Sequence, residues 1–297
     1  NGTVITSDDL PKTTTSTDVV YVSTSDTATS DSFTFKVNDG TVDSEAVTVS
    51  LAITAVNDVP VATAQTDVAA TEQTEVTLTL AGTDADSDTL SYVISTLPTN
   101  GTLSDNGSVI TADDLPKTTT SSDVVYVSTS DTATSDSFTF KVNDGTVDSE
   151  AATVSLAITA VNDVPVATAQ TDVAATEQTE VTLTLAGTDA DSDTLSYVIS
   201  TLPTNGTLSD SGTVITADDL PKTTTTADVV YVSTSDTATS DSFTFKVNDG
   251  TVDSEAATIS LAITAVNDVP VATAQTDVAA TEQTAVTLTL AGTDLDN

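Results

Sequence analysis

Short runs of alternating apolar and polar residues recur along the chain. In EVTLTLAGT (75–83) and SFTFKVND (137–144) the apolar side chains fall at every second position. This period of two is typical of β-strands that bury one face. No stretch shows a helical period, so the pattern predicts an all-β chain. Further strand-like runs lie at 90–97, 124–129 and 151–159, and turn sequences lie at 98–101, 105–107 and 143–145.

The whole pattern repeats every 105 residues. The stretch AVNDVP occurs at 55–60, 160–165 and 265–270, and every other landmark returns with the same spacing. A period of this length suits a complete small domain, not one turn of a solenoid. The repeats at 60–164 and 165–269 are nearly identical. They differ only at Asn106/Ser211, Ser108/Thr213, Ser121/Thr226, Ser122/Ala227 and Val154/Ile259.

About seven strands in roughly 100 residues is the pattern of an immunoglobulin-like Greek-key β-sandwich. We therefore expect tandem sandwiches: the C-terminal part of a repeat at 1–59, complete repeats at 60–164 and 165–269, and the first strands of another at 270–297. We expect the incomplete ends to belong to a longer fibre. The other interpretation is that they complete each other between molecules.

The alternation in SFTFKVND also separates core from surface. Phe138, Phe140 and Val142 share one face and are expected in the core, whereas Thr139 and Lys141 face outward. An intramolecular isopeptide bond needs a buried lysine, so none is expected here.

Composition excludes several classes of function. The chain has 297 residues, 45 Asp plus Glu, only 6 Lys plus Arg, no His and no Cys, and a formal charge of −39. Nucleic-acid binding needs a basic patch, which six lysines cannot supply. Nucleophile–base triads and zinc sites lack their residues, so no enzyme is expected. No apolar run approaches the roughly 20 residues that span a bilayer, so no membrane insertion is expected in this segment.

The acidic residues lie mainly in predicted loops. If the strands run in the usual order, the TDADSD and NDGTVDSE loops of the repeat at 60–164 converge on the linker Asn57-Asp58. At the opposite pole Glu72, with Asp131 or Asp136, approaches the linker Asn162-Asp163. Such clusters offer only hard oxygen ligands, which suits Ca²⁺. For each loop alone, a solvated turn remains the alternative. DADSD also lacks the EF-hand glycine and glutamate.

Repeating these positions along the chain gives the full set of candidate metal ligands. They are Asn57, Asp58, Glu72, Asp84, Asp86, Asp88, Asp136, Asn143, Asp144, Asn162, Asp163, Glu177, Asp189, Asp191, Asp193, Asp241, Asn248, Asp249, Asn267, Asp268, Asp294 and Asp296.

The stretch FTFKVNDGTVDSEAATVSLAITAVNDVPVA, followed by TEQTEVTLTLAGTDADSDTLSY, resembles the cadherin-like tandem repeats of giant bacterial RTX-type surface adhesins and related long extracellular repeat proteins. The family's Asn-Asp pair before a proline is matched by Asn57, Asp58 and Pro60, and its Asp-x-Asp loop by Asp84 and Asp86. Its acidic residue ending the sixth strand matches Asp144, and its glutamate after the first strand matches Glu72. The resemblance implies cadherin-like sandwiches with Ca²⁺ bound between domains.

The chain also departs from the family pattern. Animal cadherins carry an additional Asp two positions before the linker Asn, where this chain has Ala55, Ala160 or Ala265. Their paired acidic motif before the sixth strand is replaced by STSDTATSD. We expect about one to three ions per junction.

The leading hypothesis is a structural extender of a bacterial adhesin, outside the cell on the bacterial surface, whose partners are the neighbouring repeats of the same chain. The second is a Ca²⁺-dependent extracellular filament or sheath built from other copies of the chain. A module binding glycan, ice or a peptide is a third class. The Thr-rich runs that suggest it are also typical of an exposed sandwich face.

Overall fold

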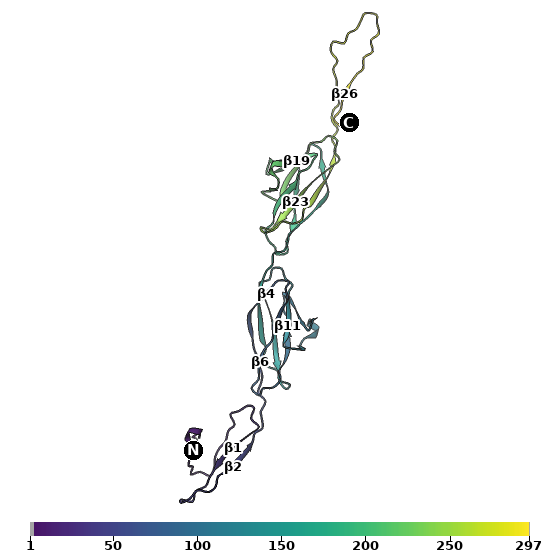
Figure 1. Cartoon of the computed structure of the whole chain (residues 1–297). Coiled ribbons are helices and arrows are strands. Elements are labelled where there is room, and N and C mark those ends of the chain that lie inside the picture. Colours follow the sequence, from purple (N-terminus) through teal and green to yellow (C-terminus); the bar gives the residue numbers. More distant parts are fainter. Residues whose placement is uncertain (1–2, 297) are drawn as a thin grey trace. The chain divides into compact units, whose positions relative to one another are not determined.

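The computed structural model describes residues 3–296, and those residues contain no α-helix (Figure 1). By contacts the chain divides into two units, residues 1–129 with 135–158 and residues 130–134 with 159–297. Each unit contains one complete β-sandwich. No helix among the described residues is long and apolar enough to cross a membrane.

The first sandwich consists of two sheets and a short two-stranded ribbon. The five-stranded sheet has the order β10-β7-β12-β13-β4, the four-stranded sheet β5-β11-β8-β9, and the ribbon pairs β3 with β6. The strands are β3 (Val61–Ala62), β4 (Gln65–Thr71), β5 (Val76–Thr79), β6 (Gly82–Thr83), β7 (Ser91–Thr96), β8 (Gly101–Asp105), β9 (Ser108–Val109), β10 (Lys117–Thr118), β11 (Asp123–Ser128), β12 (Ser135–Asn143) and β13 (Ala152–Thr159), with the 3-10 helix η2 at Ala112–Asp114.

The second sandwich repeats this arrangement, with sheets β15-β24-β23-β18-β21 and β16-β22-β19-β20 and the ribbon β14-β17. In this copy β15 and β24, the first and last long strands, run parallel. The strands are β14 (Val166–Ala167), β15 (Gln170–Thr176), β16 (Val181–Thr184), β17 (Gly187–Thr188), β18 (Ser196–Thr201), β19 (Gly206–Asp210), β20 (Thr213–Val214), β21 (Lys222–Thr223), β22 (Asp228–Ser233), β23 (Ser240–Asn248) and β24 (Ala257–Thr264), with η3 at Ala217–Asp219.

The remaining segments carry fewer strands. Residues 3–59 contain η1 (Ser7–Asp9) and a two-stranded sheet of β1 (Ser30–Phe35) and β2 (Val47–Ala52). Residues 270–296 contain the ribbon of β25 (Val271–Ala272) and β26 (Gly292–Thr293).

The core lies between the two sheets of each sandwich. Phe138, Phe140 and Val142 are at most 1% exposed, which confirms the inward face predicted from the alternation in β12. Lys141 lies on the other face and is half-exposed, with its Nζ 3.9 Å from Asp148. The all-β sandwich fold is therefore as the period-two pattern predicts.

One predicted strand divides in two. EVTLTLAGT forms β5, which pairs with β11 in the sheet, and β6, which pairs with β3 in the ribbon. Gly82 makes the change of partner possible, because a Cβ there would lie 2.8 Å from Cγ1 of Val142 and 3.0 Å from the carbonyl oxygen of Val61. The ribbon places the linker before β3 next to the loop after β6.

Candidate metal-binding sites

The first linker is bonded to two loops of the sandwich that follows it. The backbone N–H of Asp58 donates a 2.7 Å hydrogen bond to Oδ2 of Asp86, in the loop between β6 and β7. The Asn57 side-chain amide donates a 2.9 Å bond to Oδ2 of Asp144, at the end of β12. Three segments far apart in the sequence therefore meet at this linker.

The loop after β12 is folded by its own aspartate. Oδ1 of Asp144 accepts hydrogen bonds of 2.7 Å from the N–H groups of Thr146 and Val147. The pKa of Asp144 is lowered well below its usual range, first by the Asn57 amide and then by the Thr146 hydroxyl and the Val147 N–H. This carboxylate is thus held charged, with both oxygens engaged by the protein.

The TDADSD loop gathers three carboxylates. Oxygens of Asp84, Asp86 and Asp88 lie within 4.8 Å of one another. Ser87 adopts a left-handed conformation (φ 64°), and the Asp88 N–H donates to Oδ1 of Asp84. The loop curls so that charges of one sign face each other, an arrangement that is costly without a cation.

The second linker has the same local geometry. The Asp163 N–H donates a 2.6 Å bond to Oδ2 of Asp191, and the Asn162 amide donates a 2.8 Å bond to Oδ2 of Asp249. Burial raises the pKa of Asp163, and so do the charges of Asp191, Asp131 and Asp189, in that order. The neighbouring loop carries the cluster of Asp189, Asp191 and Asp193.

The third linker is approached by acids from two loops of the second sandwich, the loop between β15 and β16 and the loop between β22 and β23. Oxygens of Glu177, Asp236 and Asp268 lie within 4.8 Å of one another, and the Glu177 side chain is only 1% exposed. Oε2 of Glu177 accepts a 2.8 Å bond from the N–H of Val266, which fixes the linker against the end of β15.

On its other side Asp268 meets the loop after β26. Its N–H donates a 2.6 Å bond to Oδ2 of Asp296. The pKa of Asp268 is raised by burial and by the charges of Asp296, Glu177 and Asp294.

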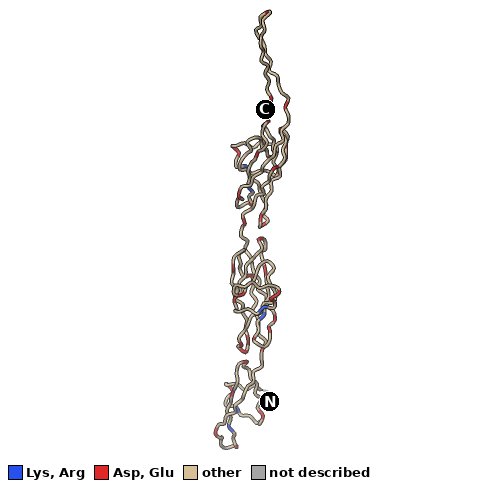
Figure 2. The backbone as a smooth tube through the Cα atoms, turned by 90° about the vertical axis from the view of Figure 1, so that its right-hand side faces the viewer, with Lys and Arg blue, Asp and Glu red and all other residues tan. Residues whose placement is uncertain are grey.

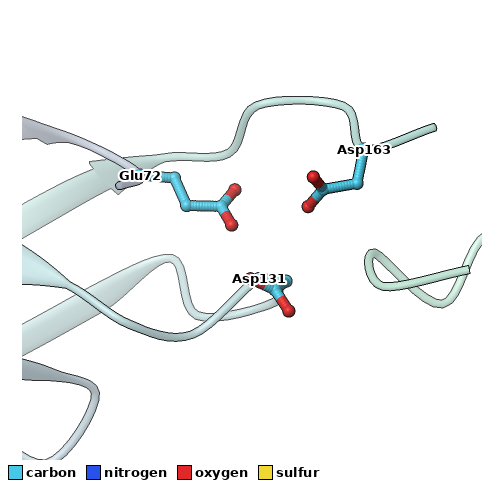
Figure 3. A group of neighbouring side chains, drawn as sticks. All are labelled: Glu72, Asp131 and Asp163. Atoms are coloured by element: carbon cyan, nitrogen blue, oxygen red, sulfur yellow. The ribbon is translucent and has the colours of Figure 1, made fainter. Parts of the chain in front are cut away.

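Figure 3 draws Glu72, Asp131 and Asp163, which are the equivalents of Glu177, Asp236 and Asp268 one 105-residue repeat earlier. They come from three separate segments: the end of β4, the loop between β11 and β12, and the linker after β13. Glu72 and Asp131 occupy the same repeat positions as Glu177 and Asp236.

Several of the clustered oxygens are buried without any hydrogen-bond partner among residues 3–296. A buried charged oxygen without a partner is strongly unfavourable, so such atoms indicate room for a bound cation. The oxygens belong to two of the three linker aspartates, Asp163 and Asp268, and to the acidic loops that follow the three linkers. They are Oδ2 of Asp84, Asp163, Asp189 and Asp268, and Oδ1 of Asp86, Asp191 and Asp296.

Protein cations do not neutralise these clusters. Figure 2 shows how few the basic residues are beside the acidic ones. The ion pairs Lys141–Asp148 and Lys246–Asp253 lie outside the clusters. The acidic clusters could therefore hold a metal ion, and their donor set consists of hard oxygen atoms.

Four candidate residues have other partners. The Asp136 carboxylate accepts bonds from the N–H groups of Thr99 and Asn100 and from the Tyr126 hydroxyl. Asp241 makes the equivalent bonds in the second sandwich. Asn143 and Asn248 donate to Asp148 and Asp253 within their own loops. Of the two alternative acids between β22 and β23, Asp236 belongs to the acidic group with Glu177 and Asp268, and Asp241 does not.

The comparisons with known proteins agree with this architecture. A family model described as cadherin-like matches residues 60–160 and 165–264. Integrin beta-like protein A of Dictyostelium discoideum is 28% identical over 190 residues, covering 60% of this chain and 10% of that protein. The chain thus spans about a tenth of the length of this relative.

Among solved structures, human mucin-like protocadherin EC1-2 is similar with 16% identity and a TM-score of 0.42, covering 70% of this chain and 98% of that one. Mouse cadherin-23 EC22-24 has 17% identity and a TM-score of 0.44, covering 82% of this chain and 79% of that one. The two stretches matched by the family model make up more than half of the sequence, and each coincides with one β-sandwich. The chain belongs to the cadherin-like family.

Proposed function

We propose that the chain is a structural extender of a bacterial extracellular adhesin, in which Ca²⁺ bound at each linker stiffens the array. The observation that carries this proposal is the set of buried, unpartnered carboxylate oxygens at the linkers. Cadherin-like repeats are extracellular modules, which supports a place outside the cell. The near-identity of successive repeats supports a role in reach and spacing, because different ligands would favour different surfaces.

The donor chemistry favours calcium over other metals. The chain contains no His and no Cys, so the sites offer only carboxylate, amide and backbone oxygens. Ca²⁺ takes six to eight such oxygens in flexible geometry, whereas Mg²⁺ demands a near-ideal octahedron and retains its water. We assign as ligands the linker aspartates Asp58, Asp163 and Asp268, together with Glu72, Asp84, Asp86, Asp88, Asp131, Glu177, Asp189, Asp191, Asp193, Asp236, Asp294 and Asp296.

Asp144 and Asp249 hold the linker from the side in this proposal. Each accepts a bond from the linker asparagine, and its Oδ1 accepts N–H groups of its own loop. These residues orient Asn57 and Asn162 and leave the linker aspartates free to face a cation. Bound Ca²⁺ would supply the positive charge that allows the clustered carboxylates to stay ionised together.

The test compares the whole chain in Ca²⁺, in Mg²⁺ and in EGTA. We expect EGTA to lower the melting temperature, because a ligand that binds only the folded state stabilises it. We also expect the radius of gyration from small-angle scattering to fall as the junctions become flexible. Mg²⁺ at the same concentration should restore little of either. Equal melting temperatures and equal radii in Ca²⁺ and EGTA would show that the proposal is wrong.

A further inference from the structure

The hairpin between β8 and β9 carries an Asn-Gly pair that its counterpart in the next repeat lacks. Asn106 and Gly107 form the two-residue turn between the paired residues Asp105 and Ser108. Both have positive φ, 49° and 79°, as a tight hairpin of this kind requires. The second sandwich has Ser211 at the corresponding position.

From this turn we infer a modification site: Asn106 undergoes spontaneous deamidation in the folded protein. The backbone nitrogen of Gly107 attacks Cγ of Asn106, so that an N–Cγ bond forms and Nδ2 leaves as ammonia with the proton lost by Gly107. Water then opens the resulting succinimide at one of its two carbonyls. The products are aspartate or isoaspartate, and water is the only co-reactant.

The surroundings of Asn106 leave the attack unobstructed. Its side chain is exposed, and no hydrogen bond to its amide is found within residues 3–296. A Cβ added to Gly107 would meet no atom within 4 Å beyond its chain neighbours, so the turn is not packed against other segments on that side. Glycine also presents the least steric hindrance to ring closure, because it has no side chain.

Two other Asn-Gly pairs among the described residues 3–296 provide an internal comparison. Asn100 donates from Nδ2 to the carbonyl oxygen of Ser135 (3.1 Å) and from its backbone N–H to Oδ2 of Asp136 (2.9 Å). The glycine that follows lies in β8 against Tyr126, where a Cβ would be 2.4 Å from the ring. Asn205 and Gly206 are held in the same way in the second sandwich.

Reaction at these two asparagines therefore requires local unfolding, whereas Asn106 can react in the native state. Every 1.4 kcal/mol needed to open the structure slows such a reaction about tenfold. Among the described residues, one Asn-Gly pair is therefore labile in the folded protein and two are protected.

Deamidation would change both charge and geometry of the hairpin. A new carboxylate would stand next to Asp105, which is 4% exposed and already accepts bonds from the N–H and hydroxyl of Thr120. Isoaspartate would add a methylene to the backbone of a two-residue turn, and turn length fixes the pairing register. Of the two complete repeats, only the one at 60–164 would age in this way, because Ser211 in the other cannot form the succinimide.

The experiment follows deamidation in the whole chain by peptide mass mapping, at mildly alkaline pH, in buffer with Ca²⁺ and in parallel in urea. In urea we expect Asn100, Asn106 and Asn205 to react at comparable rates, since each precedes glycine. In the folded protein we expect Asn106 to react at a similar rate, and Asn100 and Asn205 at least about tenfold more slowly.

Two variants complete the test. Asn106→Ser should abolish the reaction in the first sandwich, and Ser211→Asn should create a second labile site in the next. The inference would be overturned if folding slowed deamidation of Asn106 as much as that of Asn100. It would also be overturned if Ser211→Asn gave an asparagine that does not react. Neither result depends on whether the linkers bind Ca²⁺.

Discussion

The backbone N–H of Asp163 donates a 2.6 Å hydrogen bond to Oδ2 of Asp191, 28 residues later. The other oxygen of Asp191 is buried without a partner in the described chain, as is Oδ2 of Asp163. We therefore expect Asp191→Asn to weaken Ca²⁺ binding at this junction roughly tenfold or more, since a charged ligand is lost. In EGTA the same change should raise the melting temperature, because it removes repulsion from Asp163. Calorimetry and thermal melts measure both effects.

The matched control is Asp218→Asn. Asp218 is exposed in η3. Its substitution removes the same charge from a residue that belongs to none of the acidic clusters. It should leave Ca²⁺ affinity unchanged. If both variants bind Ca²⁺ as the wild type does, Asp191 is not a ligand.

Asp236, in the loop between β22 and β23, and Asp241, near the start of β23, should have different functions. Asp236 belongs to the acidic group with Glu177 and Asp268, whereas Asp241 accepts bonds from Thr204 and Asn205 in the sandwich. We expect Asp236→Asn to lower Ca²⁺ affinity and to raise the melting temperature in EGTA, because it removes repulsion from Glu177 and Asp268. Asp241→Asn should cost roughly 2–3 kcal/mol in the free energy of unfolding, because charge-assisted bonds are lost. The opposite pattern would place the metal at Asp241.

The buried tyrosines predict a loss of stability at alkaline pH. The Tyr231 hydroxyl donates a 2.9 Å bond to Oδ2 of Asp241, and its side chain is 0% exposed. Burial, followed by this bond and by the charge of Asp241, raises the pKa of Tyr231. A raised pKa means that the stabilising effect is complete below the unfolded value of about 10 and is lost as pH rises above it.

Chemical unfolding at increasing pH measures this loss. Tyr231→Phe should flatten the alkaline part of the profile, with Tyr126→Phe as the equivalent change in the first sandwich. A profile unchanged by both substitutions together would contradict the assignment.

Gly206 should tolerate no side chain. A Cβ at this position would lie 2.5 Å from both Cε2 of Tyr231 and the carbonyl oxygen of Val232. We expect Gly206→Ala to destabilise the second sandwich by about 1–3 kcal/mol through overpacking. At Gly292 the nearest atom would be 3.1 Å away, so Gly292→Ala should cost clearly less in the same urea titration.

The sequence predicted the sandwich and its core because both depend on local periodicity. The alternation around Phe138 and Phe140 was sufficient to assign their face. It could not show that EVTLTLAGT changes partner at Gly82, since this depends on the distance to Val142, which is remote in sequence. The order of the loops, by contrast, was sufficient to predict that Asp58 and Asp86 lie at the same pole of the sandwich.

The hydrogen-bond partners of Asp136 could not be predicted from the sequence. Its spacing from the linker matches that of a ligand about as well as the spacing of Asp131. Only the positions of Thr99, Asn100 and Tyr126 reveal that its oxygens are occupied. The number of donors around a carboxylate is a property of packing, and loop composition does not encode it.

The parallel pairing of β15 with β24 has a mechanical consequence. These strands carry the two ends of the second sandwich, and five residue pairs join them, from Gln170–Ile259 to Thr176–Thr264. Tension applied through the linkers pulls the two strands in opposite directions along their length. The hydrogen bonds of the ladder are then loaded together in shear and cannot open one after another like a zipper. A repeat built in this way resists force where an antiparallel terminal pair would peel apart.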